Sequence, residues 1–295
     1  MGEYAHTEYV YTVRFGNWGE EWKLKPFGDV HHDADNHAKD HWKSYLDSCK
    51  KDLDDYKGRV IFLGMGDYID YMSTSERAGV QSAHFHDTTN RTLDEYALEK
   101  TDKMLDQISF MKGKTIGLIE GNHHYKLMSG MTTTNYMCEK LQCKYLGIHT
   151  YVYLRMEKQG PHRKTVGVLI NAHHGRGGGR TIGASLNAVY SLQNAAEADI
   201  YLMGDNHQKE AARRPILKKG HGNSIFRMRE RQRIFARTGS FQKGLIHNQD
   251  SFVAKMAMAP TSLGAIDITM VPTRTHFKED GEKKEETFID MRVSY

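Results

Sequence analysis

Short apolar runs, bounded by polar or turn-forming residues, recur along the whole chain. Runs of roughly four to eight such residues predict buried strands. The predicted strands are Tyr9–Phe15, Val60–Gly64, Thr115–Ile119, Val166–Asn171, Ile200–Met203, Ile234–Thr238, Leu263–Met270 and Phe288–Val293. Strands are therefore expected from near the first residue to near the last.

Helical patterns separate several of these strands. Within His37–Tyr56 the apolar residues repeat with the roughly 3.6-residue period of an amphipathic helix, and Leu93–Met111 and Thr181–Ala196 show similar patterns. The first half of the chain alternates strand and helix, whereas the segment from about residue 208 to 295 is mostly strand. This mixture predicts an α/β fold of packed sheets flanked by helices. We expect one domain over residues 1–295, with a mostly-β C-terminal third.

The composition is that of an ordinary globular protein. The hydrophobic share is 39% and the charged share 26% of 295 residues, and no stretch approaches the roughly 18 consecutive apolar residues of a membrane span. The first residues lack the basic start and apolar run of a secretory signal. Three cysteines are too few for a disulfide framework. We therefore expect a cytoplasmic protein without a membrane partner, and these features predict no particular oligomeric state.

The net charge of +4 is distributed unevenly. The segment Lys209–Arg237 holds ten basic residues and two glutamates, so that it carries +8 while the rest of the chain carries −4. Such a block indicates either a polyanionic partner, such as DNA or RNA, or a solvated basic loop. Arg229, Arg231 and Arg233 alternate with other residues, so in a strand they would share one face and form a charged stripe.

Acidic, amide and imidazole side chains follow the extended segments. They are Asp29 and His31 after Phe27, Asp67 and Asp70 after Gly64, Asn122 and His123 after Ile119, His173 and His174 after Asn171, and Asp205 and His207 after Met203. In open α/β sheets, ligands bind outside the carboxyl ends of the strands. Because mixed oxygen and nitrogen donors suit Mn, Fe or Zn better than Ca or Mg, we expect one transition-metal site there.

The order of these motifs resembles the signature of the calcineurin-like metallophosphoesterases. The matching segments are D-x-H at Asp29–His31, G-D-x-x-D at Gly66–Asp70, G-N-H at Gly121–His123, one histidine, and G-x-x-H at Gly204–His207. The resemblance implies a four-layer α-β-β-α sandwich with two mixed sheets. It also implies hydrolysis of a phosphate ester by a hydroxide shared between two divalent ions, with Mn²⁺ expected first and Fe or Zn as alternatives.

The resemblance also implies the ligands. They are Asp29, His31 and His207 for the first metal, Asp67 for both metals, and Asn122, His174 and Asp205 for the second. His173 is the alternative to His174, which is preferred because Gly175 follows it, as in the family's His-Gly ending.

Further residues are given roles in the reaction by the same resemblance and by their position. His123 would act as general acid, and Asp70 would orient it. Arg176 and Arg180 lie in a glycine-rich segment that directly follows the fourth motif and precedes a predicted helix. Glycine backbone and a helix N-terminus favour phosphate, so both arginines are candidate substrate-binding residues.

Three departures from the family pattern affect this interpretation. Asp205 stands where the family usually has histidine, which adds negative charge to the second metal site. His124 replaces the usual acid after Gly-Asn-His, and Tyr71 and Glu120 replace arginines that mark the Ser/Thr protein phosphatase branch. The motifs therefore fit the phosphodiesterase and DNA-repair nuclease branch better than the protein phosphatases.

Three functions remain open at the level of the sequence. The first is a metal-dependent phosphodiesterase acting on nucleic acid, because the basic segment follows the last ligand and is suited to a phosphate backbone. The second is a phosphomonoesterase or small-nucleotide phosphodiesterase. The third is a non-catalytic nucleic-acid-binding module whose metal site Asp205 has weakened.

Overall fold

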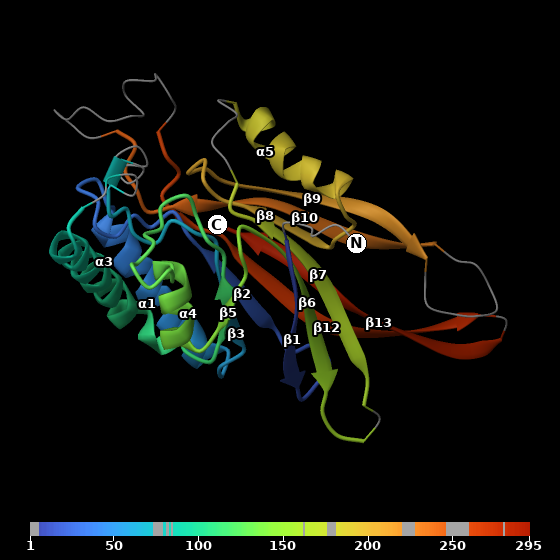
Figure 1. Ribbon diagram of the computed structural model, residues 1–295. Coiled ribbons are helices and arrows are strands. Elements are labelled where there is room, and N and C mark those ends of the chain that lie inside the picture. The colour runs from blue at the N-terminus through green and yellow to red at the C-terminus, as the bar shows by residue number, and fades with distance from the viewer. Residues whose placement is uncertain are drawn as a thin grey trace, which may run out of the picture.

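The computed structural model describes residues 6–72, 79–80, 83, 85–161, 163–175, 181–219, 228–245, 260–279 and 281–295. Within these residues the chain is α/β, with two mixed sheets packed together and helices on both outer faces (Figure 1). The fold class expected from the sequence is confirmed. Among the described residues, no helix combines the length and the apolar content that a membrane crossing requires.

The first sheet has the strand order β13-β12-β2-β3-β4-β5. The four strands from β2 to β5 are parallel to one another, and β12 runs antiparallel to both β2 and β13. Their bounds are β2 Trp22–Phe27, β3 Val60–Gly64, β4 Thr115–Leu118, β5 Lys144–Tyr145, β12 Asp267–Glu279 and β13 Glu282–Ser294.

The second sheet has the order β1-β6-β7-β8-β10-β11, with β9 paired to β10. Strands β7, β8 and β10 are parallel neighbours, whereas β6 is antiparallel to β7, and β9 to β10. Their bounds are β1 Thr7–Phe15, β6 His149–Lys158, β7 Thr165–His173, β8 Ile200–Met203, β9 Lys209–Lys219, β10 Met228–Ser240 and β11 Gly264–Ala265.

The main core lies between the two sheets. Alternate residues of each strand point inwards, so that Leu24 and Leu63 of the first sheet share one cluster with Val152, Ile170 and Ile234 of the second. All five side chains are almost completely buried. Burying each such side chain contributes roughly 1.5–3 kcal/mol, so this interface holds the strand ends in fixed positions.

Helices cover the outer faces unequally. Helices α1 (Lys39–Asp55), α3 (Asp87–Ile108) and α4 (Thr133–Leu141) pack on the first sheet, whereas α5 (Ile182–Tyr190) packs on the second, against β8 and β10 (Figure 1). The side chains of Thr132 and Thr181 cap α4 and α5 by accepting a backbone N–H of the first turn. Helices α1, α3 and α5 each connect two strands whose ends carry predicted site residues, whereas α4 connects β4, which carries such residues, to β5, which carries none.

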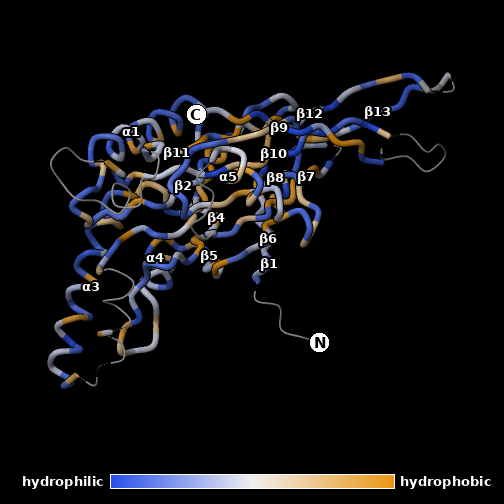
Figure 2. The backbone as a smooth tube through the Cα atoms, turned by 90° about the horizontal axis from the view of Figure 1, so that it is seen from above, coloured by the Kyte–Doolittle hydropathy of each residue, from blue (hydrophilic) through white to orange (hydrophobic). Residues whose placement is uncertain are grey.

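Two long hairpins reach beyond the rest of the sheets. They are β9–β10 and β12–β13, and in Figure 2 the projecting part of β12–β13 is largely hydrophilic. The charged run Lys278–Glu286 belongs mostly to the two strands where they meet at the end of this hairpin.

Candidate metal centre

The predicted metal ligands, with Asp70 and His123, converge at one edge of the sandwich, where β2, β3, β4, β7 and β8 end. Among the described residues, three groups have ligand atoms that all lie within 4.8 Å of one another. The groups are Asp29–His31–His207, Asp29–Asp67–His174 and His31–Asp70–His123. Asp29 and His31 each belong to two groups, so the three form one continuous cluster.

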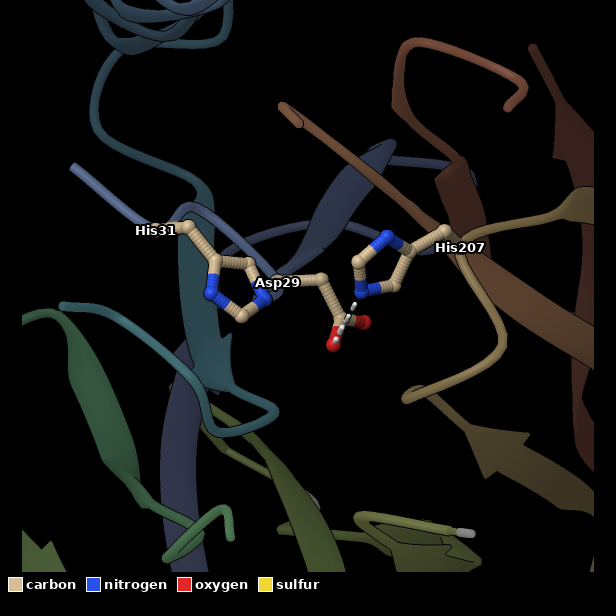
Figure 3. Close-up of side chains that lie close together, drawn as sticks. All are labelled: Asp29, His31 and His207. Atoms are coloured by element: carbon tan, nitrogen blue, oxygen red, sulfur yellow. Dashed lines mark ion pairs between the residues drawn. The ribbon is translucent and has the colours of Figure 1, made fainter. Parts of the chain in front are cut away.

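The first group brings the D-x-H motif against the last motif. His207 Nε2 lies 3.7 Å from Asp29 Oδ1, and His31 Nε2 lies 3.9 Å from Asp67 Oδ2. Figure 3 shows Asp29 between the two imidazoles. These are the three residues predicted for the first metal.

The second group lies beside it. His174 Nε2 is 3.3 Å from Asp67 Oδ2 and 3.7 Å from Asp205 Oδ1. Asn122 Nδ2 is 3.5 Å from Asp205 Oδ1. Asp67 thus lies close both to His31 of the first group and to His174 of the second, which is the position that a bridging ligand would take.

The structure distinguishes His174 from His173. His174 is buried and faces the cluster. His173 belongs to the opposite face of β7, where its ring packs 5.1 Å from that of His149 and its Nδ1 accepts a hydrogen bond from the Gly175 N–H. Of the two alternatives left by the sequence, only His174 joins the cluster.

The backbone of the cluster is unusual. Asp29, His31, Asp67, Asp205 and His207 all have positive φ, at 47°, 44°, 51°, 67° and 58°. Residues other than glycine seldom adopt this region, at a cost of roughly 1–3 kcal/mol each, and such outliers concentrate at functional sites. Five of the eight non-glycine residues with positive φ in the described part of the chain belong to this one cluster.

Two glycines of the motifs are required by close approach. A Cβ added to Gly121 would lie 1.9 Å from Asp67 Oδ1, and one added to Gly66 would lie 2.5 Å from His174 Nδ1. Both distances are far below contact, so a side chain at either position would displace a candidate ligand. This is a physical reason for glycine before Asp67 and before Asn122.

Burial and mutual charge set the protonation of the cluster. Burial raises the pKa of Asp29 to about 7, although His174 opposes the rise. Burial disfavours the charged form of His174, but the Asp67 carboxylate outweighs it and raises the His174 pKa to about 10. Burial and the nearby His31 lower the pKa of His207 to about 3. Burial and the charges of neighbouring ligands therefore shift the pKa values of these three groups in different directions.

The donor atoms fit a transition metal. His31 Nε2, His174 Nε2 and Asp205 Oδ2 are buried without a hydrogen-bond partner in the described residues. The second ring nitrogen of each of these histidines contacts an oxygen of the protein. His174 Nδ1 lies 2.8 Å from the Met65 carbonyl oxygen, and His31 Nδ1 lies 3.3 Å from Asp70 Oδ1. Metal-binding histidines are oriented in this way, with one nitrogen left for the ion.

His123 and Asp70 lie at the rim of the cluster. His123 Nδ1 forms an ion pair with Asp70 Oδ1, and its backbone N–H donates to Asp67 Oδ1 at 2.8 Å. Burial raises the pKa of Asp70, but hydrogen bonds to His123 and His31 outweigh burial and hold that pKa below its usual range. The carboxylate is therefore charged and available to orient the His123 imidazole.

Asp33 is a site residue that the sequence did not reveal. Its carboxylate accepts the backbone N–H of Asp70 at 2.6 Å and that of Tyr71 at 3.1 Å, and so fixes the loop that carries Asp70. The sequence gave no signal of this contact, because Asp70 and Tyr71 lie 37 and 38 positions after Asp33 in the chain.

Arg176 and Arg180 lie outside the described residues, so their proposed contact with substrate stays a prediction. Helix α5 begins shortly after them, at Ile182.

Arginines of the basic segment form ion pairs and ring contacts within the protein that the sequence did not indicate. Arg229 and Arg231 both form ion pairs with Glu286 of β13, which is 5% exposed, and Arg233 pairs with Glu197 at 2.9 Å. The Arg229 and Arg231 guanidinium groups also lie over the rings of Phe277 and Phe288, at 4.1 and 4.3 Å. Arg229 and Arg231 therefore hold the β9–β10 hairpin against β12–β13.

Comparison with protein-family models, with curated proteins and with solved structures gave no match. The function must therefore be inferred from the geometry of the cluster and from the order of its motifs.

Proposed function

We propose that this protein hydrolyses phosphate esters at two divalent transition-metal ions, with Mn²⁺ as the first choice and Fe or Zn as alternatives. The observation that carries the proposal is the pair of groups Asp29–His31–His207 and Asp29–Asp67–His174. The two groups share Asp29, and Asp67 of the second group lies 3.9 Å from His31 of the first. Two ions bound there would supply a hydroxide at neutral pH and hold phosphate oxygens. The motif order of the calcineurin-like metallophosphoesterases supports the same proposal.

The residues around the cluster have complementary tasks in this proposal. His123 is placed to give a proton to the leaving oxygen, because imidazole exchanges protons near neutral pH. Asp70 holds the ring through Nδ1, and we propose that Nε2 faces the substrate. Asp33 keeps Asp70 in place through the backbone.

For the substrate we propose a phosphodiester, with DNA or RNA as the first candidate because of the basic segment. A small nucleotide diester or a phosphomonoester is the second candidate, and one observation favours it. Arg229, Arg231 and Arg233 are occupied by Glu286 and Glu197, so a polynucleotide would have to compete with these pairs. A cytoplasmic location also belongs to the proposal, since the three cysteines are free thiols.

The test is a titration of the metal-free protein with Mn²⁺, followed by hydrolysis of bis(p-nitrophenyl) phosphate, p-nitrophenyl phosphate and single-stranded DNA. We expect about two equivalents of Mn²⁺ and turnover of the diester. His31→Ala should abolish turnover, whereas His32→Ala is a matched control, because the neighbouring ring contacts Gln107 rather than the cluster. Absence of Mn²⁺-dependent turnover with all three substrates would overturn the proposal.

A further inference from the structure

Arg237 is the most unusual charged residue near the cluster. It belongs to the basic segment, yet its side chain is 0% exposed and is among the largest fully buried side chains in the described part of the protein. Strand pairing explains its position, because Arg237 lies opposite Met203 of β8, the residue before Gly204. It therefore lies beside the loop that presents Asp205 and His207.

The guanidinium joins two elements of the site. Its Nη1 donates to the Gly204 carbonyl oxygen at 2.7 Å, and its Nε donates to the Ser185 carbonyl oxygen in α5 at 3.3 Å. A second link runs in parallel, since Asn206 Nδ2 donates to Ser185 Oγ at 2.7 Å. Arg237 thus fixes the backbone immediately before Asp205 to α5.

The guanidinium also places a positive charge near the buried carboxylates of the site. Asp29, Asp67 and Asp205 are three carboxylates with little or no exposure, and buried carboxylates close to one another repel strongly. Burial raises the pKa of Asp205, and the positive charges of His174 and, after it, Arg237 oppose that rise. Arginine keeps its proton even when buried, so this positive charge is permanent and does not depend on a bound metal.

We propose that Arg237 is a positioning residue that holds the Gly204–His207 loop in place for the second metal and, together with His174, offsets the negative charge of Asp205. The part of this proposal that concerns metal rests on the proposed function. The part that concerns charge applies to the metal-free protein as well.

The first experiment is a double-mutant cycle on the metal-free full-length chain, with the melting temperature as the measurement. Arg237→Met removes the hydrogen bonds to the Gly204 and Ser185 carbonyl oxygens and one of the positive charges near Asp205, and should lower the melting temperature by roughly 6–10 °C. In the background of Asp205→Asn, which needs no counter-charge, the same change should cost less than half as much. If Arg237→Met does not fold, Arg237→Gln takes its place, because it keeps a donor for the Gly204 carbonyl.

The control is Arg233→Met, on the same strand. Arg233 is also buried, at 8% exposure, but pairs with Glu197 away from the cluster, so its cost should be the same in both backgrounds. Equal costs of the Arg237 change in both backgrounds would overturn the charge balance.

The second experiment titrates each folded variant with Mn²⁺ by calorimetry. Arg237→Met should lower the stoichiometry from about two towards one, whereas Arg233→Met should keep the value of the parent. Two tight equivalents in Arg237→Met would overturn the positioning role. If the parent itself binds no Mn²⁺, the proposed function fails, and the melting-temperature cycle still decides whether Arg237 balances Asp205.

Discussion

Strand β2 leads to two clusters that each contain a buried charged residue, and the clusters differ in how many of their polar atoms have hydrogen-bond partners. Lys25, within the strand, is 1% exposed and donates to Asp52 at 2.5 Å and to Asp267 at 2.8 Å. Asp29, just after the strand, belongs to the metal-site cluster, where two imidazole nitrogens and a carboxylate oxygen have no hydrogen-bond partner in the described residues.

The difference separates a cluster that supports the fold from the candidate metal site. The Lys25 cluster is complete, and its residues have ordinary backbone conformations. The metal-site cluster combines positive φ values with unpartnered donor atoms, and both features cost stability unless a ligand compensates them. Both clusters contain buried charge, so burial of charge alone does not distinguish them. Missing hydrogen-bond partners and positive φ values distinguish the candidate metal site from the Lys25 cluster.

The largest expected effect is on activity at the incomplete cluster. Asp67→Asn removes the carboxylate that lies close to both His31 and His174 and should lower Mn²⁺-dependent diester hydrolysis by roughly 10³-fold. Asp52→Asn, the same change in the Lys25 cluster, should leave kcat within about twofold. Steady-state kinetics of both folded variants measure this difference, and equal losses would remove the distinction between the clusters.

The next effect is on stability at the complete cluster. Lys25→Met leaves Asp52 and Asp267 without their shared cation and should lower the free energy of unfolding by about 3 kcal/mol. The folded fraction should keep its activity, because Lys25 contacts no residue of the metal-site cluster in its hydrogen bonds or ion pairs. Urea denaturation provides the measurement, and a loss of activity without a loss of stability would contradict this account.

The pH dependence of Mn²⁺ affinity should sharpen the comparison further. In the metal-free protein the His174 pKa is raised to about 10 and the Asp29 pKa to about 7. A metal must displace the His174 proton below pH 10 and the Asp29 proton as well below pH 7. Affinity should therefore rise with pH, by at least about tenfold per unit between pH 7 and 9 and more steeply below 7. Calorimetry at several pH values tests this, and an affinity independent of pH would contradict it.

The smallest effect on catalysis is expected in the hairpins. Replacing Arg229, Arg231 and Arg233 together by Gln leaves the buried Glu286 carboxylate without its counter-charges and should lower stability. Small-diester hydrolysis should be unchanged, because these residues lie outside the cluster. If single-stranded DNA binding and its salt dependence are also unchanged, the small-molecule candidate takes first place over nucleic acid.

The strands that carry the site were the most predictable part of the fold. Val60–Gly64 and Ile200–Met203 were predicted with their exact bounds, because strands buried on both faces are continuous apolar runs. Strand β9 was missed because its sequence, KEAARRPILKK, is polar and becomes a strand only by pairing with β10. Strand β6 was missed although buried and more exposed residues alternate along it, a pattern that the sequence does show.

The parts of the site that depend on short sequence motifs could be predicted. The parts that depend on contacts between distant segments of the chain could not. The ligand positions follow from motifs placed directly after strands. The choice between His173 and His174 does not, because adjacent strand residues face opposite sides and only the sheet register shows which side meets the cluster. Arg237 was counted with a basic surface segment, and only its pairing with β8 reveals that it is buried.

The most direct test of the two-metal centre is anomalous diffraction from crystals of the protein soaked in Mn²⁺. We predict two peaks roughly 3.5–4 Å apart. The first should contact Asp29, His31 and His207, the second Asn122, His174 and Asp205, and Asp67 should touch both. A single peak, or peaks that contact none of these side chains, would contradict the account.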